Sequence, residues 1–126
     1  MGYLEDSMEN FNEKACYLEI HFEEWPMLAK LGDDELQSLY AALAAALDTV
    51  DCPAQGMKAS GDRLRIVVQL SEGRTIDEIL NALESASKSC LAGRNDYIEP
   101  ETCIVESISP HNVVDAVVQL HRPPLD

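Results

Sequence analysis

The chain has 126 residues and a mass of 13.9 kDa, a length that suits one domain and is too short for two ordinary ones. Apolar residues make up 46% and charged residues 25%, the balance of a globular protein rather than a disordered one. The 23 acidic residues against 9 basic ones give a net charge of −14, which argues against direct binding of nucleic acid or of anionic membranes.

The sequence shows no targeting or membrane-spanning segment. No basic start precedes an apolar stretch, as it would in a secretory signal. The longest nearly apolar stretch, residues 39–47, is about nine residues long, against the roughly 20 needed to cross a bilayer. We therefore expect a cytoplasmic protein with no membrane partner.

Four cysteines lie far apart and form no C-x-x-C pair: Cys16, Cys52, Cys90 and Cys103. In a chain long enough to build its own core, the simplest interpretation is four reduced thiols, mostly buried as small apolar groups. A structural zinc site usually takes its ligands from closely spaced pairs, which this sequence lacks. We predict no metal and no cofactor.

The first half of the chain predicts an acidic tail, a strand and a helix. Residues 1–14 carry four carboxylates and few large apolar groups, and they predict a flexible tail ahead of a single α+β domain over residues 15–126. Apolar and polar side chains alternate over residues 16–23, the pattern of a half-buried strand, which the following Trp-Pro pair ends. A helix with one apolar face is expected from Gly32 to Cys52.

The middle of the chain predicts a hairpin and a second helix. Residues Met57–Ala59 and Arg63–Leu70 read as two strands joined by the turn Ser60-Gly61-Asp62. The second helix is expected to begin at Thr75, where the run Thr-Ile-Asp-Glu matches a capping box, and to end at Gly93.

The C-terminal part predicts a fourth strand and one ambiguous segment. Thr102–Ile108 has a strand pattern, and Ser109-Pro110 breaks it. In Val113–Leu120 the preceding Ser-Pro pair favours a helix, whereas four valines within six residues favour a strand. We favour the helix for this last segment.

The resulting order β–α–β–β–α–β predicts a ferredoxin-like α+β sandwich with a C-terminal helix or strand added. Its four-stranded antiparallel sheet would carry both main helices on one face, with the first and third strands side by side at the centre. The other face of the sheet would be open. This architecture hosts many unrelated activities, so it does not itself indicate a function.

The polar side of the first strand is one candidate binding site. It carries Tyr17, Glu19 and His21, and Arg63 and Arg65 would lie across from them if the third strand is the neighbour. An imidazole beside carboxylates on an open sheet face could hold a polar ligand. The same residues would equally suit a solvated sheet face with cross-strand charge pairs.

The acidic residues are concentrated near the N-terminus. Residues 1–35 hold ten carboxylates and two lysines, so this stretch contributes −8 of the −14. Spaced carboxylates could imitate the phosphates of DNA and occupy a basic groove, although solubility alone would also explain them. The candidate partner-binding residues are Glu5, Glu9, Glu13, Glu23, Glu24, Asp33 and Asp34.

A stripe of small residues suggests a second kind of contact. Ala41, Ala42, Ala45 and Ala46 leave a smooth surface on the first helix, where a second subunit could approach. A homodimer is therefore a possible assembly. Alanine is also the best helix former, so the stripe needs no partner to explain it.

The order of strands and helices resembles that of some small metal-dependent DNA-cleaving transposases. Those proteins carry two histidines, one residue apart, on a strand that corresponds to Arg63–Leu70. The matching triplet here is Arg63-Leu64-Arg65, and arginine does not act as a metal ligand. The resemblance therefore implies the topology but not the metal site.

Charge and size together favour an interaction protein. We predict an acidic inhibitor, similar to the DNA-mimicking proteins of phages and mobile elements, that occupies a basic surface of a nucleic-acid-binding protein without touching nucleic acid itself. The alternative is a ligand-binding regulatory domain or dimer that uses the open sheet face. A small enzyme is the third hypothesis and a non-enzyme is favoured, because Cys16 and His21 lie on opposite faces of their strand and no carboxylate pair stands out.

Overall fold

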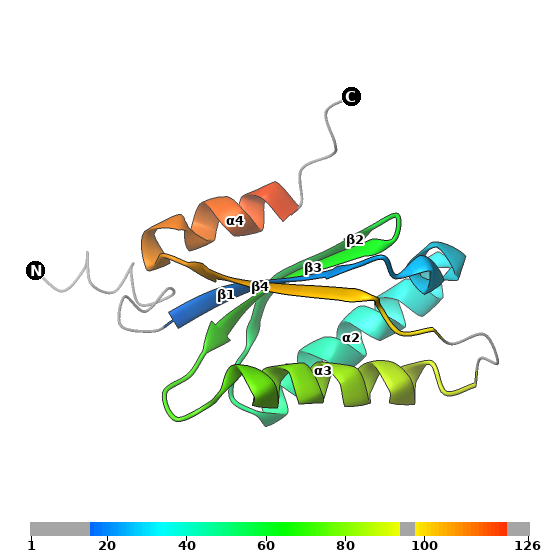
Figure 1. Cartoon of the computed structure of the whole chain (residues 1–126), viewed down its shortest axis with the longest axis horizontal. Coiled ribbons are helices and arrows are strands. Elements are labelled where there is room, and N and C mark those ends of the chain that lie inside the picture. The colour runs from blue at the N-terminus through cyan, green and yellow to red at the C-terminus, as the bar shows by residue number, and fades with distance from the viewer. Residues whose placement is uncertain (1–15, 94–97, 121–126) are drawn as a thin grey trace, which may run out of the picture.

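The structure, a computed structural model, describes residues 16–93 and 98–120, and these form a four-stranded sheet with helices on both of its faces (Figure 1). In chain order the elements are β1 (Cys16–Glu23), the 3-10 helix η1 (Pro26–Lys30), α2 (Asp33–Thr49), β2 (Ala54–Ser60), β3 (Arg63–Leu70), α3 (Ile76–Cys90), β4 (Thr102–Ile108), the 3-10 helix η2 (Pro110–Asn112) and α4 (Val113–Leu120). The predicted α+β class is confirmed.

All neighbouring strands of the sheet are antiparallel, in the order β2-β3-β1-β4. The first and third strands therefore lie side by side at the centre, as the sequence indicated. In their register Leu18 faces Val68 and Ile20 faces Ile66. Because side chains alternate between the faces of a strand, this register collects the large apolar residues of both central strands on one face.

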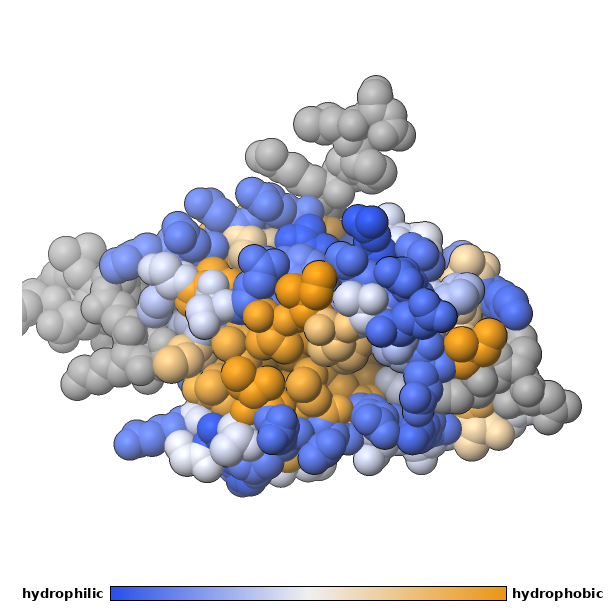
Figure 2. All heavy atoms as spheres, in the orientation of Figure 1, coloured by the Kyte–Doolittle hydropathy of each residue, from blue (hydrophilic) through white to orange (hydrophobic). Residues whose placement is uncertain are grey.

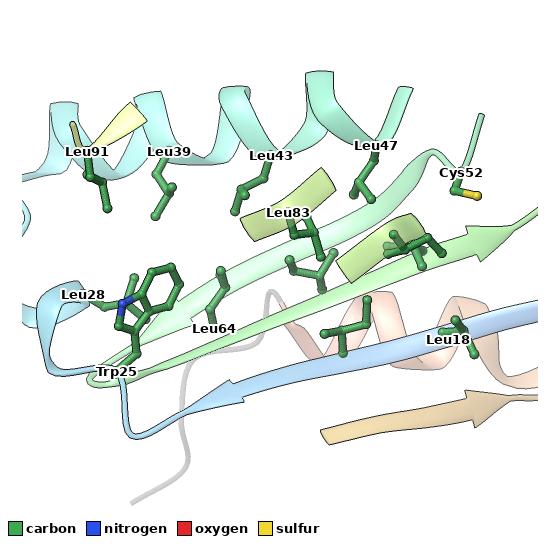
Figure 3. Close-up of a cluster of buried hydrophobic side chains, with 14 of the residues drawn as sticks. Leu18, Trp25, Leu28, Leu39, Leu43, Leu47, Cys52, Leu64, Leu83 and Leu91 are labelled. Carbon is green, nitrogen blue, oxygen red and sulfur yellow. The ribbon is translucent and has the colours of Figure 1, made fainter. Parts of the chain in front are cut away.

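The main core fills the space between that face and the helices α2 and α3. Leu39, Leu43 and Leu47 recur every four residues along α2 and are fully buried. Figure 3 shows them pointing from α2 toward the strands that carry Leu18 and Leu64. Burial of side chains of this size stabilises the fold by about 1.5–3 kcal/mol each.

Trp25 joins segments that are far apart in the sequence. Its backbone N–H donates to the carbonyl of Asp62 in the β2–β3 turn at 2.9 Å, and its indole N–H donates to the carbonyl of Ile98 at 2.6 Å. The sequence predicted only that Trp25 and Pro26 end the first strand. It missed η1, in which Met27 and Leu28 are buried in the core.

The predicted start of the second helix is confirmed. The backbone N–H of Glu78 donates to Thr75 Oγ1 at 3.2 Å, and the backbone N–H of Thr75 donates to Glu78 Oε1 at 3.1 Å. This reciprocal pair satisfies two backbone groups that a helix leaves free at its first turn. Helix α3 then begins at Ile76 and ends at Cys90.

The expectation of a fully open second sheet face is wrong. The last segment is the helix α4, and it packs on the face opposite α2 and α3 (Figure 1). Its Val113 and Leu120 form a second buried cluster with Tyr17 of β1 and Val67 of β3. The valines that made this segment ambiguous serve a helix here, because tertiary contacts outweigh their modest intrinsic preference for strands.

The expectation of mostly buried cysteines is also wrong. All four thiols are free, but Cys52 alone is buried, Cys90 is half-buried, and Cys16 and Cys103 are exposed. In the described residues no helix is long and apolar enough to span a membrane. The predicted tail, residues 1–14, lies outside the described residues, so that prediction and the domain boundary after it stay predictions.

Leu43→Ala tests the position of the main core. We expect it to lower the free energy of unfolding by about 2–5 kcal/mol, because Leu43 is fully buried and its truncation leaves a cavity. Gln37→Ala, at an exposed position of the same helix, should change the stability by no more than about 0.5 kcal/mol. Urea unfolding of the two variants measures both values. Equal effects would show that α2 does not bury this face.

Glu78→Gln tests the charge at the start of α3. Hydrogen bonding to the Arg74 guanidinium, aided by the Thr75 backbone, holds the pKa of the Glu78 carboxyl below its ordinary value of 4.5. The lowered pKa stabilises the fold above pH 4.5, and this contribution is lost as the pH falls through the lower folded value. Glutamine keeps the capping hydrogen bonds. Its destabilising effect should therefore be present at neutral pH and vanish in acid, while a pH-independent difference would contradict the ion pair.

Candidate functional site

The candidate site is the part of the second sheet face that α4 leaves uncovered. Helix α4 lies over the end of the sheet that carries Tyr17, Val67 and Ile108. The strand registers then place ten side chains on the remaining part of that face, which we name the open half-face: Glu19, His21, Glu23, Lys58, Ser60, Arg63, Arg65, Thr102, Ile104 and Glu106.

An ion-pair network occupies the middle of the open half-face. Arg65 Nε donates to Glu19 Oε2 at 2.7 Å, and Arg65 Nη2 contacts the same oxygen. His21 Nε2 lies 3.3 Å from Glu19 Oε2 and 3.3 Å from Glu106 Oε1. Both distances suit ion pairs of a protonated imidazole, but the angles are not those of hydrogen bonds, and this buried nitrogen has no hydrogen-bond partner.

Charge is divided across this surface by strand. Lys58, Arg63 and Arg65 lie on β2 and β3, whereas Glu19, Glu23 and Glu106 lie on β1 and β4. Three of the nine basic residues of the chain are therefore gathered here, and the three carboxylates balance them. The molecule as a whole has a net charge of −14 and repels anions. An anion is repelled least where it approaches this neutral surface from its basic side.

The structure brings together four of the five residues predicted as a ligand site. Glu19, His21, Arg63 and Arg65 share the open half-face, with His21 directly opposite Arg65. Tyr17 lies on the same face but is only 1% exposed because α4 covers it. Lys58 and Glu106 also lie on this face, although the sequence alone did not single them out. The alternation of β2 and β4 would have found them once the strand order was known.

The residues predicted to bind a basic partner do not share one surface, unlike the four ligand-site residues on the open half-face. Glu5, Glu9 and Glu13 lie outside the described residues. Asp33 and Asp34 are exposed in the first turn of α2, where carboxylates favour the helix dipole. Glu23 ends β1.

Glu24 has a structural role of its own. It takes a positive φ of 55°, and its carbonyl accepts the N–H of Glu101. A positive φ cannot continue a strand, so this residue turns the chain after β1.

The open half-face lacks the paired histidines of the metal site that metal-dependent transposases of this topology carry. Arg63 and Arg65 stand where those proteins carry histidines, and a guanidinium has no lone pair to give a metal. Over the described ranges, no three His, Cys, Asp or Glu side chains are placed to hold a metal ion.

Comparisons with known proteins identify the fold. No family model and no curated protein matches the sequence. A provisionally assigned transposase from Deinococcus radiodurans is similar in structure, with a TM-score of 0.65 and 12% identity over 86% of this chain and 93% of that one. A REP-associated tyrosine transposase bound to a REP hairpin is similar with a TM-score of 0.58 and 10% identity, over 86% of this chain and 64% of that one. At these identities the likeness shows a shared fold.

These structures contradict the leading hypothesis from the sequence. The chain shares its fold with transposases, one of them bound to a REP hairpin, and this likeness points away from a DNA-mimicking inhibitor. The preference for a non-enzyme and the exclusion of direct nucleic-acid binding are wrong for the same reason. Net charge is a poor guide here, because it does not show that three of the nine basic residues share one face of the sheet.

A double-mutant cycle on Glu19 and Arg65 tests the network. We expect a coupling free energy of about 1 kcal/mol between Glu19→Gln and Arg65→Gln, because the Glu19 side chain is only 13% exposed and the bond is charge-assisted. The exposed i,i+4 pair Glu84–Lys88 is the control and should couple by about 0.3–0.5 kcal/mol or less. Equal couplings, measured by urea unfolding, would mean that the buried contact is not formed.

Proposed function

We propose that this chain has a transposase-like function and binds a folded DNA end, such as a hairpin, on the open half-face. The observation that supports this most is the position of Arg63 and Arg65. They lie on the strand that corresponds to the one on which the metal-dependent transposases of similar strand order carry paired histidines. The fold is shared with transposases over 86% of the chain. We also infer that the fold is the ferredoxin-like sandwich with α4 added, supported by the central place of β1 and β3.

The chemistry of the basic side fits phosphate. A guanidinium presents a planar fork of donors that matches two phosphate oxygens, and an ammonium adds a point charge. Arg63 and Lys58 are exposed, so both side chains can contact the phosphates of a DNA backbone without any rearrangement of the protein. Arg65 is already bonded to Glu19 and serves to fix that carboxylate and the neighbouring His21.

The acidic side limits how DNA can lie on this surface. Glu23 and Glu106 would repel phosphates that crossed from β3 to β1 and β4. A strand should therefore follow β2 and β3, with its backbone over Lys58 and Arg63. Such a narrow track suits a hairpin end or a single strand better than a long duplex, which would meet the acidic side as well.

The proposal predicts weak, salt-sensitive binding of a DNA hairpin. We expect a Kd of roughly 10⁻⁴ to 10⁻⁶ M near physiological salt, because a few phosphate contacts must act against the repulsion of a net negative chain. Removing both exposed cations with Lys58→Ala and Arg63→Ala should weaken binding about tenfold or more and reduce the slope of log K against log salt by roughly 1.4–1.8. Fluorescence anisotropy with a labelled hairpin measures both quantities.

The control removes one positive charge elsewhere. Lys30→Ala, at an exposed position of η1, changes the net charge by one unit and should leave the salt slope unchanged. A wild-type protein that binds no hairpin at low salt would contradict the proposal, as would a double variant indistinguishable from Lys30→Ala. Denaturing gels of the same samples, with Mn²⁺ or with EDTA, show in addition whether the bound strand is cut.

A further inference from the structure

A cavity opens at the edge of the main core, between strand β4 and helix α3. Figure 2 shows apolar side chains gathered there, with hydrophilic residues along their border. The cavity has a volume of about 200 Å³. Its lining residues come from β1, α3, β4 and the segments beside them: Phe22, Trp25, Leu80, Leu83, Glu84, Ser87, Pro100 and Cys103. Because Phe22 packs against the main core and Cys103 pairs with it, the cavity lies on the opposite side of the sheet from the open half-face.

The walls of the cavity suit one aromatic ring. Phe22 and Trp25 stand edge to face with their ring centroids 5.9 Å apart, and Leu80 and Leu83 supply aliphatic surface from α3. Aromatic side chains favour such edge-to-face and offset contacts with a further ring. An engineered apolar cavity of about 150 Å³ holds benzene. This larger cavity therefore has room for one ring with a short substituent.

Among the described lining residues, the polar side chains can accept hydrogen bonds from a ligand but offer it no strong donor. The hydroxyl of Ser87 already donates to the carbonyl of Leu83 at 2.8 Å, so its oxygen is left as an acceptor. The indole N–H of Trp25 is likewise engaged, since it donates to the carbonyl of Ile98. The carboxylate of Glu84 only accepts. A ligand of this cavity must therefore supply the donor itself.

The charge beside the cavity favours a cationic donor. Glu84 and Ser87 lie three positions apart on α3 and are therefore neighbours on its surface. Lys88 Nζ lies 2.9 Å from Glu84 Oε1 and 3.1 Å from Glu99 Oε1, and these hydrogen bonds hold the pKa of Lys88 above its ordinary value of 10.5. Two carboxylates against one ammonium leave this rim negative, on a chain with a net charge of −14. The rim attracts a cation and repels an anion.

We propose that this cavity binds a small aromatic amine. The ring packs against Phe22 and Trp25. The ammonium donates to Glu84 and Ser87, the two side-chain acceptors described above. Phenethylamine, a single ring joined to an ammonium by an ethyl chain, has this form and serves as the probe. An aromatic carboxylate of the same shape would find neither a strong side-chain donor nor an opposite charge.

The single tryptophan of the chain reports this binding directly. Trp25 lines the cavity, so phenethylamine should change its fluorescence with a saturable dependence on concentration. We expect a Kd of roughly 0.1–1 mM, because so small a ligand makes few contacts. Phenylpropionate, which has a similar shape and the opposite charge, should bind about tenfold more weakly or not at all. A wild-type chain without a saturable change would overturn the proposal, and so would equal affinities for the two probes.

Two substitutions in the Glu84–Lys88 ion pair test the position of the ammonium. Glu84→Gln removes the charge that holds the ligand and should raise the Kd about threefold, whereas Lys88→Gln removes a competing ammonium and should lower it by about the same factor. Both variants break the same ion pair, so any effect of its loss on α3 is common to them. Glu72→Gln, at an exposed position ahead of α3, changes the net charge as Glu84→Gln does and should leave the Kd unchanged. Changes of the same sign in the two ion-pair variants would contradict the proposed contact.

Cys103 tests whether the ring enters the cavity. Cys103→Phe places a side-chain ring there and should raise the Kd about tenfold or more, whereas Cys103→Ala leaves the space open and should keep the Kd within about twofold. In the wild type, saturating phenethylamine should slow the alkylation of Cys103 about threefold or more and leave that of the exposed Cys16 unchanged.

Two results would place the probe elsewhere and overturn the proposal. One is binding by Cys103→Phe as tight as by Cys103→Ala, and the other is an alkylation rate of Cys103 that the probe does not change. The cavity lies on the other side of the sheet from Lys58 and Arg63, so none of these results bears on hairpin binding.

Discussion

The antiparallel pairing of β1 with β3 is the contact on which the rest of the structure depends. Their register turns Ile20 and Ile66 toward the helices and Glu19 and Arg65 away from them. One arrangement of hydrogen bonds thus fixes both the apolar core and the polar network. A shift of one residue would exchange the two faces, burying charged side chains without solvent. The core and the candidate site are therefore specified together.

Helix α4 determines how much of the second sheet face is accessible to a ligand. Its contacts with Tyr17 and Val67 cover one end of the sheet and give Tyr17 a structural role. The other described tyrosine, Tyr40, accepts the backbone N–H of Ala59 with its hydroxyl. A tyrosine hydroxyl is thus not presented on the open half-face by the described residues. Beside its three carboxylates, this surface offers three basic side chains and one imidazole, and these suit recognition of phosphate.

Local patterns in the sequence predicted most helices and strands. They could not predict which charged residues, distant in the sequence, come together on one face of the sheet. The capping box at Thr75 and the alternation in β1 depend on neighbours within a few residues, so they are legible without a structure. The covering of Tyr17 by α4 depends on residues about 100 positions apart, which no local pattern encodes. The total charge suggested an acidic inhibitor because a sum cannot show that Lys58, Arg63 and Arg65 share one face.

The central claim is that a transposase-like fold meets DNA with the basic side of the open half-face. Mapping the amide chemical shifts of the labelled protein during titration with a DNA hairpin tests it most directly. The account predicts that the amides of β2 and β3 around Lys58 and Arg63 shift most, together with His21, while those of α2 and α3 stay in place. Shifts confined to α2 and α3, or no shifts at low salt, would contradict it.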